Sequence, residues 1–75
     1  MKGFKFSIES KIARISEQYA KIKNITVEES MRKFLSSGTY RLLNDSETGL
    51  YLEVTDYVYD IFLEELAWEP QRVHE

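Results

Sequence analysis

Residues 7–24 read SIESKIARISEQYAKIKN, and this stretch decides the fold class. Its large apolar side chains recur at spacings of four, three, four and three residues, at Ile8, Ile12, Ile15, Tyr19 and Ile22. Such a period places all five on one face of a helix. Ser7 has the side chain of an N-cap, and Asn24 can adopt the left-handed conformation that ends a helix. We therefore expect an amphipathic helix over residues 7–23.

Two further helices follow, separated by capping and turn residues. Thr26 and Glu29 have the spacing of a capping box, in which each side chain accepts a hydrogen bond from the other residue's amide. A second helix is expected to begin there and to end at residues 36–38. A short helix is expected over residues 39–43. The two or three residues between the first two helices favour an antiparallel hairpin.

The second half of the chain is expected to turn and then form the last helix. Residues 44–49 are rich in Asn, Asp and Ser and end in Gly, which is typical of a turn. Residues 50–52 are expected to form an extended apolar connector. The last helix is expected from about Asp56 to Trp68, with Thr55 as its cap. Pro70 disfavours helix at the residue before it and ends the helix.

The sequence thus predicts one all-α domain over residues 1–75, a compact bundle of three main helices plus one short helix. Residues 1–6 are expected to form an N-terminal arm and residues 70–75 a frayed tail. The predicted core consists of Ile8, Ile12, Ile15, Tyr19, Ile22, Met31, Phe34, Leu35, Leu43, Val58, Ile61, Phe62 and Leu66.

The residue types that are missing exclude most catalytic chemistry. The chain has no cysteine, and its one histidine, His74, lies next to the C-terminus, where nothing would hold a catalytic base in place. No glycine-rich phosphate loop, nucleophile–base pair or metal-ligand spacing is present. We therefore expect no enzymatic activity, no cofactor and no metal. The lack of cysteine, of a signal peptide and of a long apolar run predicts a cytoplasmic protein without membrane contact.

Charge is distributed unevenly along the chain. Residues 1–41 have a net charge of +5, residues 42–75 a net charge of −8, and the whole chain −3. A basic stripe on the first helix consists of Lys11, Arg14 and Lys21. An acidic stripe on the last helix consists of Asp56, Asp60 and Glu64, and Glu53 precedes it just before the helix. The two stripes can pair within the fold or face a partner, and the sequence does not distinguish these arrangements.

Tyrosines are concentrated in the second half, at Tyr40, Tyr51, Tyr57 and Tyr59. A thin core uses such large rings, and we expect their hydroxyl groups at the surface. Tyr51 and Trp68 flank the predicted core, so they are the aromatic residues expected on a protein-binding patch, where Tyr and Trp are enriched.

These features favour a protein-interaction module that binds a protein partner or a second copy of itself. Two alternatives stay open. The first two helices could bind nucleic acid through the basic stripe, although the acidic net charge disfavours this. The acidic, tyrosine-rich half could bind a small ligand or a cation, although an ordinary solvated helix face explains the acids equally well.

Three segments carry a resemblance to a known family. Residues 34–40 read FLSSGTY, residues 47–51 read ETGLY and residues 57–60 read YVYD. Over about residues 12–65 the chain resembles a family of short uncharacterised bacterial proteins with a domain of unknown function. Its members resemble the products of small genes found near toxin-like or mobile-element genes. The resemblance implies an accessory or antitoxin-like binding role, and it transfers no functional residue.

Overall fold

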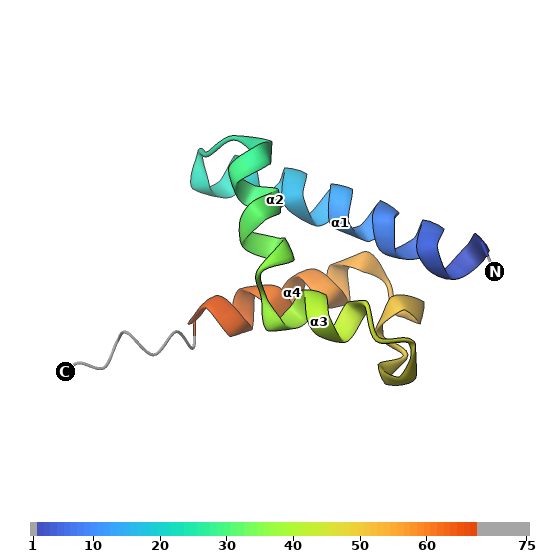
Figure 1. Cartoon of the computed structure of the whole chain (residues 1–75). Helices are drawn as coiled ribbons and strands as arrows, with labels where there is room; N and C mark the ends of the chain where they lie inside the picture. Colours follow the sequence, from blue (N-terminus) through green and yellow to red (C-terminus); the bar gives the residue numbers. More distant parts are fainter. Residues whose placement is uncertain (1, 68–75) are drawn as a thin grey trace.

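The computed structural model describes the backbone of residues 2–67 and the side chains of residues 7–67. Within this range every regular element is helical, and the expected all-α bundle is confirmed (Figure 1). The elements in chain order are α1 (Lys2–Lys23), α2 (Val27–Leu35), α3 (Gly38–Leu43), the 3-10 helices η1 (Ser46–Thr48) and η2 (Leu50–Leu52), and α4 (Thr55–Ala67). No helix in this range combines the length and the apolar character that crossing a membrane requires.

Helices α1 and α2 form the expected hairpin. Asn24 adopts a left-handed conformation with a φ of 57°, and Ile25 donates a backbone hydrogen bond to the carbonyl of Ala20. The capping box is also confirmed, because the Glu29 amide donates to Thr26 Oγ1 at 3.1 Å and the Thr26 amide donates to Glu29 Oε1 at 3.4 Å. The predicted start at Ser7 was wrong. Helix α1 begins at Lys2, and residues 2–6 contain no proline that would prevent it.

Helices α3 and α4 lie side by side and run in opposite directions, on one side of α1, and α2 links the two layers (Figure 1). Ser37 caps α3, because its hydroxyl accepts a hydrogen bond from the Tyr40 amide at 3.1 Å. The expected extended connector at residues 50–52 was wrong. These residues form η2, which follows the left-handed Gly49 (φ 71°) and directs Leu50 into the core.

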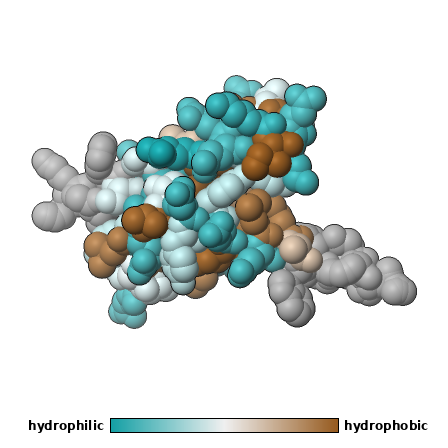
Figure 2. Space-filling model, turned by 180° about the vertical axis from the view of Figure 1, so that it is seen from behind, coloured by the Kyte–Doolittle hydropathy of each residue, from teal (hydrophilic) through white to brown (hydrophobic). Residues whose placement is uncertain are grey.

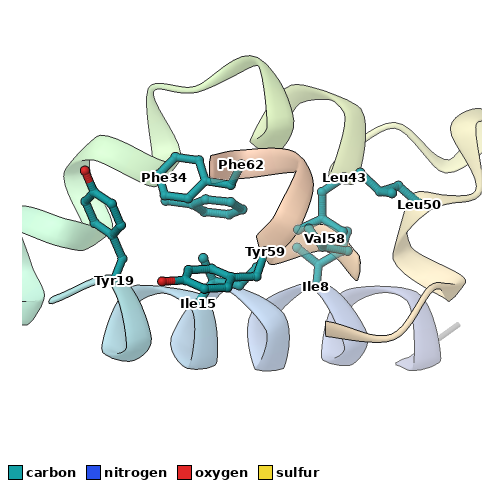
Figure 3. Close-up of a cluster of buried hydrophobic side chains, with 9 residues drawn as sticks. All are labelled: Ile8, Ile15, Tyr19, Phe34, Leu43, Leu50, Val58, Tyr59 and Phe62. Carbon is teal, nitrogen blue, oxygen red and sulfur yellow. The ribbon is translucent and has the colours of Figure 1, made fainter. Parts of the chain in front are cut away.

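The core lies where side chains from α1, α2, α3 and α4 converge (Figure 3). Two edge-to-face ring contacts organise its centre, with ring centroids 5.3 Å apart for Tyr19 and Phe62 and 5.0 Å apart for Phe34 and Phe62. The buried apolar residues are Ile8, Ile15, Tyr19, Ala20, Phe34, Leu43, Leu50, Val58, Tyr59 and Phe62.

The prediction of a buried side chain was wrong for two residues. Ile22 is 64% exposed and Leu35 is 42% exposed, because they lie in the last turns of α1 and α2, which the described residues leave partly uncovered. Four further predicted core residues are only partly buried, namely Ile12, Met31, Ile61 and Leu66.

Small residues allow α1 and α2 to approach closely. Ser16 and Ser30 are fully buried, and the Ser30 hydroxyl donates a hydrogen bond to the carbonyl of Ser16 at 2.7 Å. A larger side chain at either position would push the two helices apart, since interiors are close-packed.

Candidate functional site

Three of the charged residues singled out in the sequence line one shallow depression, of about 460 Å³. Lys11 and Arg14 come from α1, and Asp56 comes from the first turn of α4. We call this depression the corner surface. Its lining residues are Lys11, Arg14, Leu52, Glu53, Val54, Thr55 and Asp56.

The apolar part of the corner surface is Leu52 and Val54, which are 73% and 69% exposed. The backbone on both sides of them is fixed. Leu50 is buried in the core, and its carbonyl accepts a hydrogen bond from the Glu53 amide at 3.0 Å. The Val54 carbonyl accepts from the Tyr57 amide at 3.1 Å, which begins α4. The two apolar side chains are therefore presented to solvent by an anchored segment.

Charges of both signs line the same depression as this apolar pair. Lys11 and Arg14 contribute positive charge, and Glu53 and Asp56 contribute negative charge. Among residues 7–67, none of these four takes part in an ion pair within 4.0 Å. The sequence left open whether the two stripes meet in the fold. The structure brings only the first member of the acidic stripe, Asp56, beside the basic stripe.

The remaining predicted site residues lie elsewhere. Lys21 lines a separate depression at the α1–α2 turn, and Glu64 lines a groove between α3 and α4. Asp60 is exposed on α4, and Tyr51 is half-buried against the core instead of standing on the surface. Trp68 lies outside the described residues.

The groove between α3 and α4 is the second concave surface, with a volume of about 530 Å³. Leu42 and Ile61 give it an apolar floor, and Arg41 and Glu64 are among the residues around it. Figure 2 shows the back of the molecule, where hydrophobic residues lie in separate groups among hydrophilic ones. Exposed apolar surface on this side is therefore local.

Sequence reasoning missed Glu65, which joins α4 to the start of α3. Its carboxylate accepts hydrogen bonds from the Gly38 amide at 2.7 Å, the Thr39 amide at 2.8 Å and the Thr39 hydroxyl at 2.7 Å. The first amides of a helix have no partner within the helix, and a carboxylate satisfies them. One sequence signal for such a contact was available. The first turn of α3 contains no acidic residue of its own, so its amides can donate to a carboxylate from elsewhere in the chain.

These contacts determine the ionisation of Glu65. Burial alone would raise its pKa. The hydrogen bonds from the Thr39 hydroxyl and from the Gly38 and Thr39 amides, together with the charge of Arg41, outweigh burial and hold the pKa below its ordinary value of 4.5. Glu65 is thus a carboxylate at neutral pH, fully engaged in holding α3 on α4. This role is structural.

Tyr59 differs from the expectation that its hydroxyl reaches the surface. The residue is 9% exposed, and no group among the described residues forms a hydrogen bond with the hydroxyl. Burial raises the pKa of Tyr59 above 10.0, and the nearby Tyr19 and Asp60 raise it further. The hydroxyl therefore stays protonated at neutral pH and cannot act as a base there.

Residues 7–67 contain no group of three His, Cys, Asp or Glu side chains suited to a metal ion.

Comparisons with known proteins identified no relative. No family model, no curated protein and no solved structure matches this chain.

Proposed function

We propose that this chain is a non-catalytic protein-interaction module and that its partner docks on the corner surface. The observation that carries the proposal is the exposure of Leu52 and Val54, at 73% and 69%, in a depression that two basic and two acidic residues also line. Isolated exposed apolar residues are common on proteins. Exposed apolar residues grouped with polar and charged ones are instead typical of a protein interface.

The anchoring of this segment favours binding. Leu50 on one side is buried, and the backbone of Val54 starts α4 on the other. Docking would therefore order few groups that are not already ordered, and less conformational entropy would be lost on association. Burying an exposed Leu or Val side chain contributes about 1.5–3 kcal/mol each, enough to matter in a small interface.

The same geometry weighs against the nucleic-acid alternative. Glu53 and Asp56 lie in the same depression as Lys11 and Arg14. A phosphate backbone that approached the two basic residues would also approach two carboxylates, which repel it. The cation alternative has little support, because the other acids of the stripe, Asp60 and Glu64, do not line this depression.

The cellular setting is part of the proposal. The resemblance to short bacterial proteins supports an accessory or antitoxin-like partner role, and the absence of cysteine from the sequence fits the reducing cytoplasm. The partner in this setting would be a protein encoded close by, or a second copy of the chain.

The test compares proteins retained from a host extract by the immobilised chain and by two variants. The Leu52→Glu/Val54→Glu variant replaces the two apolar residues of the corner surface with charged ones. The Ile22→Glu/Val27→Glu variant is the matched control, because these residues are also exposed, at 64% and 45%, and lie at the α1–α2 turn. Circular dichroism verifies that both variants keep the helical fold.

We expect one protein to be retained by the native chain and by the control, and to be lost from the corner variant. If copies of the chain associate, the retained protein can be the chain itself. Equal retention by all three chains, or loss from the control alone, would place binding elsewhere. No specific retention by the native chain would remove the basis of the proposal.

A further inference from the structure

The charge pattern of the corner surface indicates which partner it accepts. We infer that this partner is a second copy of the chain, joined to the first across a two-fold axis through the corner surface. This inference rests on the proposed function, because it names the occupant of the same surface.

The corner surface is balanced in charge, unlike the rest of the chain. Lys11 and Arg14 are matched by Glu53 and Asp56, whereas the whole chain has a net charge of −3. A partner with one sign of charge would be attracted by two of these four residues and repelled by the other two. A partner that presents both signs can pair with the basic and with the acidic residues.

A second copy in a two-fold arrangement presents both signs of charge. In such an interface the same patch of each copy contacts the other. Every contact therefore occurs twice, with the roles of the two copies exchanged. The basic residues on α1 of one copy would face Glu53 and Asp56 of the other, while Leu52 and Val54 would meet their own counterparts at the centre.

The charged groups are available for this pairing. Within the described part of the chain, none of the four charged residues of the corner surface forms an ion pair, with the nitrogen and oxygen within 4.0 Å, although they line one depression. Pairing between copies would therefore replace no ion pair among these residues.

Charge reversal tests the arrangement. In Lys11→Glu/Arg14→Glu all four charges of the corner surface are negative, and in Glu53→Lys/Asp56→Lys all four are positive. Sedimentation is measured from about 1 μM to about 1 mM, which spans moderate to weak association. We expect the native chain to form dimers as concentration rises, each reversed variant to remain monomeric, and an equal mixture of the two variants to dimerise again.

A control separates specific pairing from general attraction between chains of opposite charge. Lys21→Glu/Lys33→Glu has the same net charge as Lys11→Glu/Arg14→Glu, but its changes lie outside the corner surface. Mixed with Glu53→Lys/Asp56→Lys, it is expected to restore no pairing with that variant.

Each contrary outcome identifies what is wrong. A native chain that stays monomeric up to about 1 mM overturns self-association. The proposed function still stands in that case if a host protein is retained in a manner that requires Leu52 and Val54. Dimers unaffected by either reversal would overturn the corner as the interface. Monomeric variants whose mixture also stays monomeric would overturn the base-to-acid, two-fold arrangement.

Discussion

Glu65 is the residue whose removal tests most directly how α3 is held. Its carboxylate accepts three hydrogen bonds from Gly38 and Thr39. Hydrogen bonds to a charged group contribute about 1.5–3 kcal/mol, and a lost helix cap costs about 1 kcal/mol, so Glu65→Gln should lower the free energy of unfolding by about 1–3 kcal/mol. Urea unfolding at neutral pH measures the loss. Glu64→Gln, at the exposed neighbouring position, is the control and should change it little.

The lowered pKa of Glu65 makes this contribution depend on pH. Its pKa in the folded protein lies below 4.5 because hydrogen bonds to Thr39 and Gly38 outweigh burial. The stabilisation is therefore present above 4.5, the ordinary value, and is lost as the pH falls through the lower, folded value. The difference in stability between the native chain and Glu65→Gln should stay constant near neutral pH and shrink in acid. A difference that is the same at both extremes would contradict this role.

Phe34 and Leu35 are adjacent in the chain but have opposite environments. Phe34 is fully buried and contacts Phe62 edge to face, while Leu35 is 42% exposed. Phe34→Leu should cost about 1–3 kcal/mol because it leaves space in a close-packed centre. Leu35→Ala should cost less than about 1 kcal/mol, as surface changes usually do. Thermal unfolding of both variants distinguishes the positions, and equal losses would contradict the observed packing.

At the scale of elements, the capping box is the local signal with the clearest consequence. Thr26 and Glu29 exchange hydrogen bonds at the start of α2, a helix of nine residues that contributes Phe34 to the core. Thr26→Ala should lower stability by about 1 kcal/mol, since it leaves the Glu29 amide without its acceptor. Guanidinium unfolding measures this. An unchanged midpoint would mean that packing alone holds α2 in place.

Local patterns predicted the elements well where helix periodicity and caps act within a few residues. The stripe from Ile8 to Tyr19, the stop at Asn24 and the box at Thr26 all correspond to the structure. Local patterns did not predict the conformation of residues 50–52. In η2, Leu50 packs into a core that is built by elements distant in the chain.

Helix ends show the same limit. Ile22 continues the apolar period of α1, but its burial depends on whether another element covers the last turn, and among the described residues it is left 64% exposed. The contact of Glu65 with α3 joins residues 26 and 27 positions apart in the chain. Periodicity along one helix contains no information about such a pairing.

At the scale of the whole molecule, the uneven charge of the sequence is only partly neutralised by folding. The net charge of residues 1–41 is +5 and that of residues 42–75 is −8. The corner surface brings Lys11 and Arg14 beside Asp56, while Asp60 and Glu64 lie outside it. Three of the candidate interaction residues named from the sequence thus line the corner surface, whereas its apolar pair, Leu52 and Val54, was not among those candidates.

The balance of charge at the corner surface also predicts a response to salt. Association through opposite charges near solvent weakens as salt shortens the range of the attraction. Binding at the corner surface should therefore weaken between low and high salt without disappearing, because Leu52 and Val54 contribute an apolar part that salt does not screen. Titrations at two ionic strengths measure this, and binding that strengthens steadily with salt would contradict a role for the charged residues.

The central claim is that the chain binds protein through the corner surface, and carboxylate footprinting tests it most directly. The chain is labelled at its exposed acids when free, at low concentration, and when bound, to the retained partner or to itself at high concentration. The account predicts that labelling of Glu53 and Asp56 falls on binding, while labelling of Glu28 and Glu47, exposed outside the corner surface, does not change. Protection of Glu28 or Glu47 with Glu53 and Asp56 unaffected would contradict it.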